Sequence, residues 1–347
     1  MRRGTLRGKS LTKRRLQALA APIAVGALLM LSAAPAQAAF PGTDGVTVFY
    51  ASFIAGEGQP DGIYTATTVG GYQQKFITAG YQPRFNPYGK RIAYQDVSGA
   101  IYTVRVGGTD KQLIYRPVSG SLASIPFWSP KHTPGGERLG LVVTPQTGVD
   151  SRKGDIWTIP TSDGKPIGPA TRLTYIGAEK CGVVTADWSP DGTHVAYGVH
   201  YSSRYGVCGS KGELIVRNLS SNTLVVVPPY RNAAGYLWPP IQARYTADGT
   251  TLAINLESTD NCNFDDLRYN IAAQTYTDLG SSSQCIGPAS DGTAKVEIAP
   301  TPSGGEAYLT SSQNGTSFCL VSPNASKCGT VESWANIDVQ PVAPGGP

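Results

Sequence analysis

Three histidines, His132, His194 and His200, are the residues of this 347-residue chain best suited to acid–base or nucleophilic chemistry. His132 falls in a predicted turn and His194 in a predicted strand, and a structural role accounts for both. The chain has no G-x-S-x-G motif. Because the members of a Ser-His-Asp triad can lie far apart in sequence, nothing selects one serine from many. The sequence therefore names no catalytic residue, and a lyase or hydrolase acting on an extracellular polymer stays open as an alternative.

Oxygen-bearing side chains gather in one segment beside Cys262, at Asp260, Asn261, Asn263, Asp265 and Asp266. Such side chains are the ligands that a hard cation such as calcium prefers. A solvated polar loop explains the same residues without an ion. Neither a C-x-x-C motif nor a Cys/His spacing of the zinc type occurs. We expect no metal and no cofactor, and leave calcium binding at this loop open.

Aromatic and arginine side chains mark the predicted binding surface. They lie in two segments, 201–205 and 229–242, and the second is long for a connection between strands. Long ordered loops on a rigid scaffold commonly carry function, and Tyr, Trp and Arg are enriched at binding hot spots. Packing between repeats is the competing explanation for Trp238, which precedes two prolines. The predicted binding residues are Tyr201, Arg204, Tyr205, Tyr230, Arg231, Tyr236 and Trp238.

The first 38 residues are predicted to be a secretory signal peptide. Basic residues precede an apolar stretch at 16–32, and Ala36-Gln37-Ala38 form a small-residue cleavage site. A membrane anchor is the alternative, but the stretch contains Pro22 and is shorter than the roughly 20 residues that a span needs. Arg14-Arg15 leaves twin-arginine export open. We expect a mature chain of residues 39–347 in a secreted or periplasmic space, with no membrane span.

The formal net charge of +5 of the full chain comes from this segment. It holds seven of the 29 Lys and Arg residues and no acidic residue, which leaves 22 basic against 24 acidic side chains and a formal net charge of −2. No cluster of cations remains that would indicate a nucleic-acid partner. We expect a protein or carbohydrate partner instead.

A strand–turn–strand unit organises the mature chain. Its clearest copy is residues 185–197, TADWSPDGTHVAY, in which Pro190-Asp191-Gly192 make a tight turn between two apolar strands. Further strands follow each copy, and a repeat of about 40 to 60 residues with several strands predicts the blades of a propeller. The turn units lie at 82–89, 125–130, 187–192, 243–249 and 297–300.

The strands predicted at the two ends of the mature chain together make one blade. Residues 45–52 and 62–66 are predicted to be the second and third strands of an N-terminal blade that has no first strand before it. Residues 336–341 have the spacing of a first strand. We therefore predict an all-β, six-bladed β-propeller as a single domain, closed by pairing of the C-terminal strand with the N-terminal blade, which removes an exposed sheet edge.

The repeats resemble those of TolB-type β-propellers. The resemblance rests on the W-S-P-D-G turn at 188–192, the I-A-Y and V-A-Y strands at 92–94 and 195–197, the G-D-I-W strand at 154–157 and the R-L-T ending at 172–174. It covers nearly all of the mature chain and is strongest in the second to fourth blades. It implies a six-bladed propeller used for protein interaction or ligand display. The chain differs from TolB in leaving no room for an additional N-terminal α/β domain and in having cysteines.

Six cysteines in a chain that is predicted to be exported indicate disulfide bonds. Fifteen pairings are possible, but the connection before a first strand and the one between second and third strands share one face of a propeller. This placement favours sequential pairing, with each bridge worth about 2–4 kcal/mol in the chain-entropy model. A reactive thiol is the alternative. The predicted pairs are Cys181 with Cys208, Cys262 with Cys285, and Cys319 with Cys328.

Together these features predict an exported, non-catalytic binding or scaffold propeller that displays a loop face to a protein or carbohydrate. An enzyme and a structural envelope protein are the alternatives. An enzyme should bring acidic or histidine side chains together at the centre of the propeller, a binding protein should present aromatic side chains on one face, and a structural protein should do neither.

Overall fold

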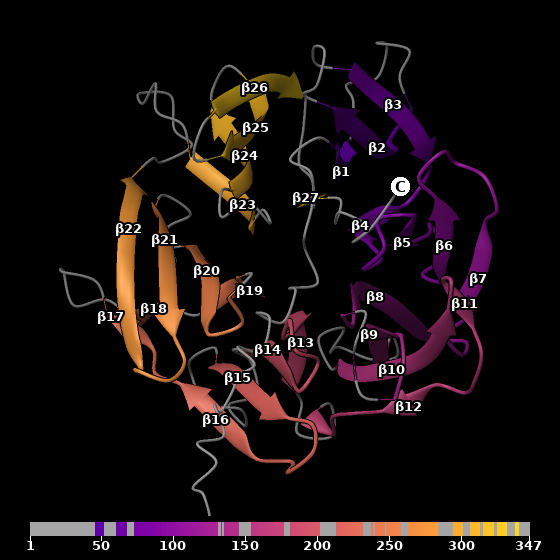
Figure 1. Ribbon diagram of the computed structural model, residues 1–347, viewed down its shortest axis with the longest axis horizontal. Coiled ribbons are helices and arrows are strands. Elements are labelled where there is room, and N and C mark those ends of the chain that lie inside the picture. The colour runs from indigo at the N-terminus through magenta and orange to yellow at the C-terminus, as the bar shows by residue number, and fades with distance from the viewer. Residues whose placement is uncertain are drawn as a thin grey trace, which may run out of the picture. The chain divides into compact units, whose positions relative to one another are not determined.

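The computed structural model shows a chain of antiparallel β-sheets (Figure 1). The described residues belong to one compact unit, Pro35–Pro347. Among them there is no α-helix, and hence none long and apolar enough to cross a membrane. The predicted all-β class is confirmed, whereas the predicted signal peptide, residues 1–38, lies outside the described residues. These are 46–51, 60–67, 73–130, 133, 135–145, 154–176, 181–201, 213–231, 237–238, 240–246, 248–257, 263–283, 294–300, 306–312, 315–322, 325–331 and 337–339.

The first three sheets follow the chain from its N-terminal side. The first has the order β27-β1-β2-β3, made by Ile337–Val339, Val46–Ala51, Gly62–Thr67 and Gln73–Thr78. The second contains β4 (Tyr81–Phe85), β5 (Arg91–Gln95), β6 (Ile101–Arg105) and β7 (Gln112–Tyr115). The third contains β8 (Ser121–Trp128), β9 (Arg138–Pro145), β10 (Asp155–Ser162) and two short strands on β10, β11 (Lys165–Pro166) and β12 (Thr171–Arg172).

The remaining sheets keep the same order. The fourth contains β13 (Cys181–Trp188), β14 (His194–Tyr201), β15 (Glu213–Asn218) and β16 (Leu224–Val227). A separate two-stranded hairpin follows, β17 (Tyr230–Arg231) with β18 (Leu237–Trp238). The fifth contains β19 (Pro240–Tyr245), β20 (Thr251–Glu257), β21 (Asn263–Asn270) and β22 (Thr275–Ser283). The sixth contains β23 (Ala294–Pro300), β24 (Glu306–Ser312), β25 (Gly315–Ser322) and β26 (Ala325–Val331).

The C-terminal strand completes the first sheet, as predicted. β27 pairs antiparallel with β1, and Asp338 lies opposite Val48. The same strand contacts β23 and β24 of the sixth sheet and β4 of the second. The first strands of successive sheets are also in contact with one another, from β4 and β8 through β13 and β19 to β23. β27 therefore belongs to the first sheet and also contacts the second and the sixth.

The described core lies between successive sheets, and the second sheet shows how, because its strand β5 is buried on both faces. Ile92 and Tyr94 of β5 pack into a cluster with Val48 and Ile63 of the first sheet. Ala93, which points to the other face, packs with side chains of the third sheet. The unbroken apolar run I-A-Y is thus explained by burial on both sides rather than on one.

The S-P-D-G turn is held by its own side chains. Asp191 Oδ1 accepts hydrogen bonds from Ser189 Oγ at 2.6 Å and from the Thr193 backbone N at 2.9 Å. The Gly192 backbone N donates to the Ser189 carbonyl at 2.9 Å, and Gly192 has a φ of 73°. The turn needs glycine at this φ, so local chemistry fixes the hairpin between β13 and β14.

We expect Gly140→Ala to destabilise the protein. Gly140 lies directly opposite Phe127 across β8 and β9, and a Cβ there would lie 2.3 Å from Phe127 Cζ. Overpacking of this kind costs about 1–3 kcal/mol, more than the roughly 0.4–1 kcal/mol that a Gly→Ala change gains by restricting the unfolded chain. The matched control is Gly107→Ala, because a Cβ there meets nothing within 4 Å. Equal urea midpoints for the two variants would contradict the prediction.

Candidate functional site

Buried charges recur at one position of the first strands. The position lies two residues before the repeated turn, and four of its residues form what we call the inner-strand cluster: Arg84, Asp187, Arg244 and Asp338. Asp187, Arg244 and Asp338 are 5%, 4% and 0% exposed. The third sheet has Phe127 at the same position. Charges as buried as these require partners.

The two acids of the cluster make the same contact in different sheets. Asp187 Oδ2 accepts a hydrogen bond from the Tyr245 backbone N at 2.8 Å, and Asp338 Oδ2 accepts one from the Phe85 backbone N at 2.7 Å. Each donor is the residue that follows an arginine of the cluster in another sheet. In addition, Arg244 Nη1 donates to Asp338 Oδ1 at 3.1 Å. The cluster therefore ties the fourth sheet to the fifth, and the first sheet to both the second and the fifth.

Burial controls the protonation of Asp187. Desolvation raises its pKa to about 6, although Arg244 and the Tyr245 backbone N–H lower it. A carboxyl group with such a pKa exchanges its proton near neutral pH, which is a property shared by many catalytic acids and bases. Its Oδ2, however, already accepts the hydrogen bond from the Tyr245 backbone N of the fifth sheet. In the described geometry the cluster stabilises the fold by hydrogen bonds between sheets.

The sequence interpretation missed this cluster, although a signal for it exists. Aligning the repeats on their turns places Arg84, Asp187, Arg244, Glu297 and Asp338 at one position, so five of six copies carry a charge. A charged side chain that recurs at the same position of otherwise apolar strands indicates a shared structural role. Glu297 of β23 lies opposite Leu309 of β24.

The structure brings together three of the seven predicted binding residues. Tyr230 and Arg231 form β17, where Tyr230 lies opposite Trp238 of β18. Tyr201 ends β14 opposite Cys181. The other three, Arg204, Tyr205 and Tyr236, lie outside the described residues.

The β17–β18 hairpin is anchored on the outer strand of the fifth sheet. Tyr230 Oη donates a hydrogen bond to Asp278 Oδ2 at 2.9 Å, and its ring centroid lies 5.3 Å from that of Tyr276. Tyr276 Oη in turn donates to the Pro228 carbonyl at 2.6 Å. Tyr230 thus holds the hairpin in place, and Arg231 is exposed.

The cysteine and calcium predictions fall partly outside the described residues. Cys208, Cys262, Cys285, Asp260 and Asn261 lie there. Among the described residues, no group of three or more His, Cys, Asp or Glu side chains is placed to hold a metal ion.

One predicted disulfide can be compared with the backbone register. Cys319 and Cys328 are directly opposite on β25 and β26. Opposite residues of an antiparallel pair have Cα atoms about 4.5–5.5 Å apart, within the range of disulfide geometry. The pairing of Cys319 with Cys328 remains a prediction, and the register is compatible with it.

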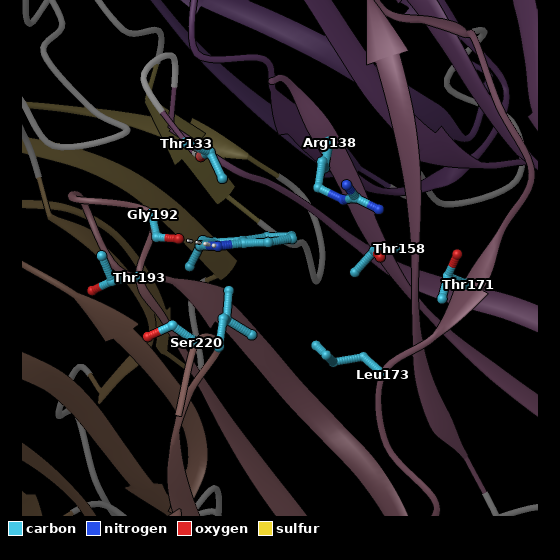
Figure 2. Close-up of a pocket in the computed structure, with 10 residues that line it drawn as sticks. Thr133, Arg138, Thr158, Thr171, Leu173, Gly192, Thr193 and Ser220 are labelled. Carbon is cyan, nitrogen blue, oxygen red and sulfur yellow. Dashed lines mark hydrogen bonds between the residues drawn. The ribbon is translucent and has the colours of Figure 1, made fainter. Parts of the chain in front are cut away.

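A pocket of about 370 Å³ opens between the third and fourth sheets (Figure 2). Figure 2 shows Arg138 and Thr158 on one side, with Thr193 and Ser220 facing them from the other. The Trp188 indole forms part of its wall, and its Nε1 donates a long hydrogen bond, 3.4 Å, to the Gly192 carbonyl. The lining residues are Thr133, Arg138, Thr158, Thr171, Leu173, Trp188, Gly192, Thr193, Leu219 and Ser220.

A hydrogen-bonded chain fixes the rim of this pocket on the side of the fourth sheet. Asn218 Nδ2 lies 3.0 Å from His194 Nε2, and His194 Nδ1 lies 2.6 Å from Thr193 Oγ1. Because an amide nitrogen can only donate, Nε2 accepts and the proton of a neutral His194 is on Nδ1. Thr193 Oγ1 then donates to Asp191 Oδ2 at 2.7 Å. His194 therefore takes part in the hydrogen bonds that hold this rim, and His132 lies outside the described residues.

Comparison with known proteins gives a fold and no closer assignment. No family model matches the chain, and no curated protein sequence matches it significantly. Among solved structures, TolB from Acinetobacter baumannii is 16% identical over 87% of this chain and 68% of its own, with a TM-score of 0.59. Kuenenia stuttgartiensis hydrazine synthase is 13% identical over 93% of this chain, with a TM-score of 0.63, and the match spans half of that protein's length.

An oligogalacturonate lyase in complex with manganese is also similar, at 11% identity over 85% of this chain and 76% of its own, with a TM-score of 0.52. Identities this low relate folds and not activities. The predicted resemblance to TolB is confirmed at the level of the fold: this chain has a TolB-like β-propeller fold.

Proposed function

We propose that residues 39–347 form a closed six-bladed propeller that is exported behind the signal peptide and binds a partner rather than catalysing a reaction. Six sheets of four or five strands in chain order support the blade count. The pairing of β27 with β1 and the contacts of β27 with β23 support closure. A TolB-like fold and the predicted signal are both consistent with a secreted or periplasmic protein.

The observation that carries the binding function is the β17–β18 hairpin. It belongs to none of the larger sheets, yet Tyr230 anchors it on β22 and places Trp238 opposite Tyr230. Ordering an insertion costs conformational entropy without adding to a blade, which is expected where the insertion serves a partner. The proposed binding face consists of this hairpin together with Tyr201, Arg204, Tyr205 and Tyr236.

Removing an aromatic side chain from this face should weaken binding and leave the fold intact. The mature chain, immobilised as bait, is first used to capture protein or carbohydrate from the medium and envelope of the source organism. Trp238→Ala and Tyr236→Ala should each lower the affinity for the captured partner about thirtyfold, the effect of losing a hot-spot aromatic residue. The melting temperature should change little.

The matched control is Tyr175→Ala, which removes an aromatic side chain that is 68% exposed in another part of the chain. It should leave the affinity unchanged. Unchanged capture by the Trp238 and Tyr236 variants, together with a large drop in melting temperature, would place both side chains in the packing between blades and contradict the proposed face.

An enzyme acting on an extracellular polymer is the second candidate, because Asp187 has a pKa near neutrality and lies with arginines in the inner-strand cluster. We favour binding, since Asp187 is 5% exposed and accepts the Tyr245 backbone N–H. Cleavage of a polymer by the mature chain that is lost in Asp187→Asn would reverse this preference.

A further inference from the structure

The pocket between the third and fourth sheets has a positive charge in its lining. Of the described residues that line it, Arg138 alone is ionisable. In the described part of the chain its guanidinium makes no hydrogen bond or ion pair, whereas its backbone N donates to Ser129 Oγ at 2.8 Å. A planar guanidinium with unused donors matches a carboxylate, which it can bind through two parallel hydrogen bonds. The pocket therefore favours an anion.

Three of the five hydroxyl groups in the described lining offer acceptors rather than donors. Thr133 Oγ1 donates its hydrogen to the Pro130 carbonyl at 2.8 Å, and Ser220 Oγ donates to Asn218 Oδ1 at 2.9 Å. Thr193 Oγ1 likewise donates to Asp191 Oδ2. A hydroxyl has one hydrogen and two lone pairs, so what these three groups have left is acceptor capacity. A ligand that satisfies them must bring its own O–H or N–H donors.

Leu173, Leu219 and the Trp188 indole form the apolar part of the wall. Leu173 and Leu219 are partly buried hydrophobic residues, and both pack on the core cluster that contains Trp188. The volume of the pocket lies in the range of small-molecule sites, about 300–1,000 Å³. The ligand therefore combines an anionic group, several hydroxyl donors and an apolar face.

We propose that this pocket binds a sugar acid, that is, a pyranose ring with several hydroxyl groups and one carboxylate. The carboxylate lies on the Arg138 guanidinium, the ring hydroxyls donate to Thr133, Thr193 and Ser220, and the C–H face of the ring packs on the apolar wall. This site lies between the third and fourth sheets and shares no residue with the proposed face around the β17–β18 hairpin. It does not depend on that face.

Three probes of similar size separate the parts of this chemistry. Titration calorimetry of the mature chain should show that D-glucuronate binds about tenfold or more tightly than D-glucose, which lacks the carboxylate, and than cyclohexanecarboxylate, which lacks the hydroxyls. The indole N–H resonance of Trp188 should shift on addition of D-glucuronate, because its acceptor, the Gly192 carbonyl, belongs to the pocket lining. A uronic acid disaccharide that binds more tightly than D-glucuronate assigns a polymer end as the ligand, and equal binding assigns the free acid.

Arg138→Gln should weaken D-glucuronate binding about tenfold or more and leave the weak binding of D-glucose unchanged. The matched control, Arg116→Gln, removes an exposed arginine elsewhere and should have no effect. Ser220→Ala removes one exposed hydroxyl acceptor and should weaken binding severalfold, and it tests the site if Arg138→Gln fails to fold. The proposal is overturned if D-glucuronate does not bind, if glucose or cyclohexanecarboxylate binds as tightly, or if Arg138→Gln folds and binds D-glucuronate normally.

Discussion

Replacing Asp338 by alanine should lower the free energy of unfolding by about 3–5 kcal/mol, the cost of removing one partner of a buried ion pair. Asp338 is fully buried and serves two other sheets through its two oxygens. The change removes the carboxylate that Arg244 contacts at 3.1 Å and the acceptor of the Phe85 backbone N. Urea unfolding of the mature chain measures the loss.

Asp338→Asn should cost less than Asp338→Ala, because an amide oxygen can still accept from Phe85. The matched control is Asp96→Ala, which removes an aspartate whose contacts stay within one turn, to Ser98 and Ala100. Deleting residues 335–347, which removes β27 altogether, should destabilise the protein at least as much as Asp338→Ala. A truncated chain that melts at the temperature of the full mature chain would exclude closure by this strand.

Asp187→Asn should change how stability depends on pH. The folded-state pKa of Asp187, about 6, is raised from an ordinary value of 3.8, so the folded protein binds this proton more tightly than the unfolded chain. Stability therefore falls as pH rises from about 4 to about 6, by about 3 kcal/mol for a shift of about two pH units, and is constant above. Asparagine has no such proton. The stability of Asp187→Asn relative to the original chain should thus improve by about this amount between pH 4 and pH 7.

Urea unfolding at pH 4, 5, 6 and 7 gives this difference directly, because other carboxyl groups titrate equally in both proteins. Asp191→Asn provides a control of opposite sign. Burial alone would raise the pKa of Asp191, but hydrogen bonds from Ser189 and Thr193 outweigh burial and lower it. This variant should lose stability relative to the original chain as pH rises. A difference for Asp187→Asn that is the same at every pH would show that its arginine neighbours keep it ionised.

The repeated hairpins could be predicted from sequence because their chemistry is local. In the S-P-D-G turn, Ser189, Asp191 and Gly192 lie within four residues and bond to one another. The C-terminal strand was predictable for a related reason, since the N-terminal sheet lacked a first strand. The strands at the outer edge of the third sheet were harder to predict from sequence. The R-L-T ending at 172–174 contributes only Arg172 to a strand, Thr171–Arg172, and a second short strand, Lys165–Pro166, pairs elsewhere on β10. Pro160, Pro166 and Pro169 have no N–H to continue a ladder there.

The inner-strand cluster and the pocket depend on contacts that no local pattern contains. Asp338 and Phe85 are 253 residues apart, and Arg244 and Asp338 are 94 apart. The pocket joins residues of two sheets, and its threonines and serine are common residue types without a distinctive spacing. Arg138 indicated an anion-binding pocket because its guanidinium has no partner in the described structure. The sequence alone does not show which arginines lack a partner.

The completion of the first sheet by β27 has a consequence for folding. β1 lies near the beginning of the described chain and β27 at its end, so their contacts have very long sequence separation, which slows folding. Until Ile337–Val339 is available, one edge of β1 has no partner. A chain exported N-terminus first, as we propose for this one, would thus leave this edge of β1 unpaired until Ile337–Val339 had crossed the membrane.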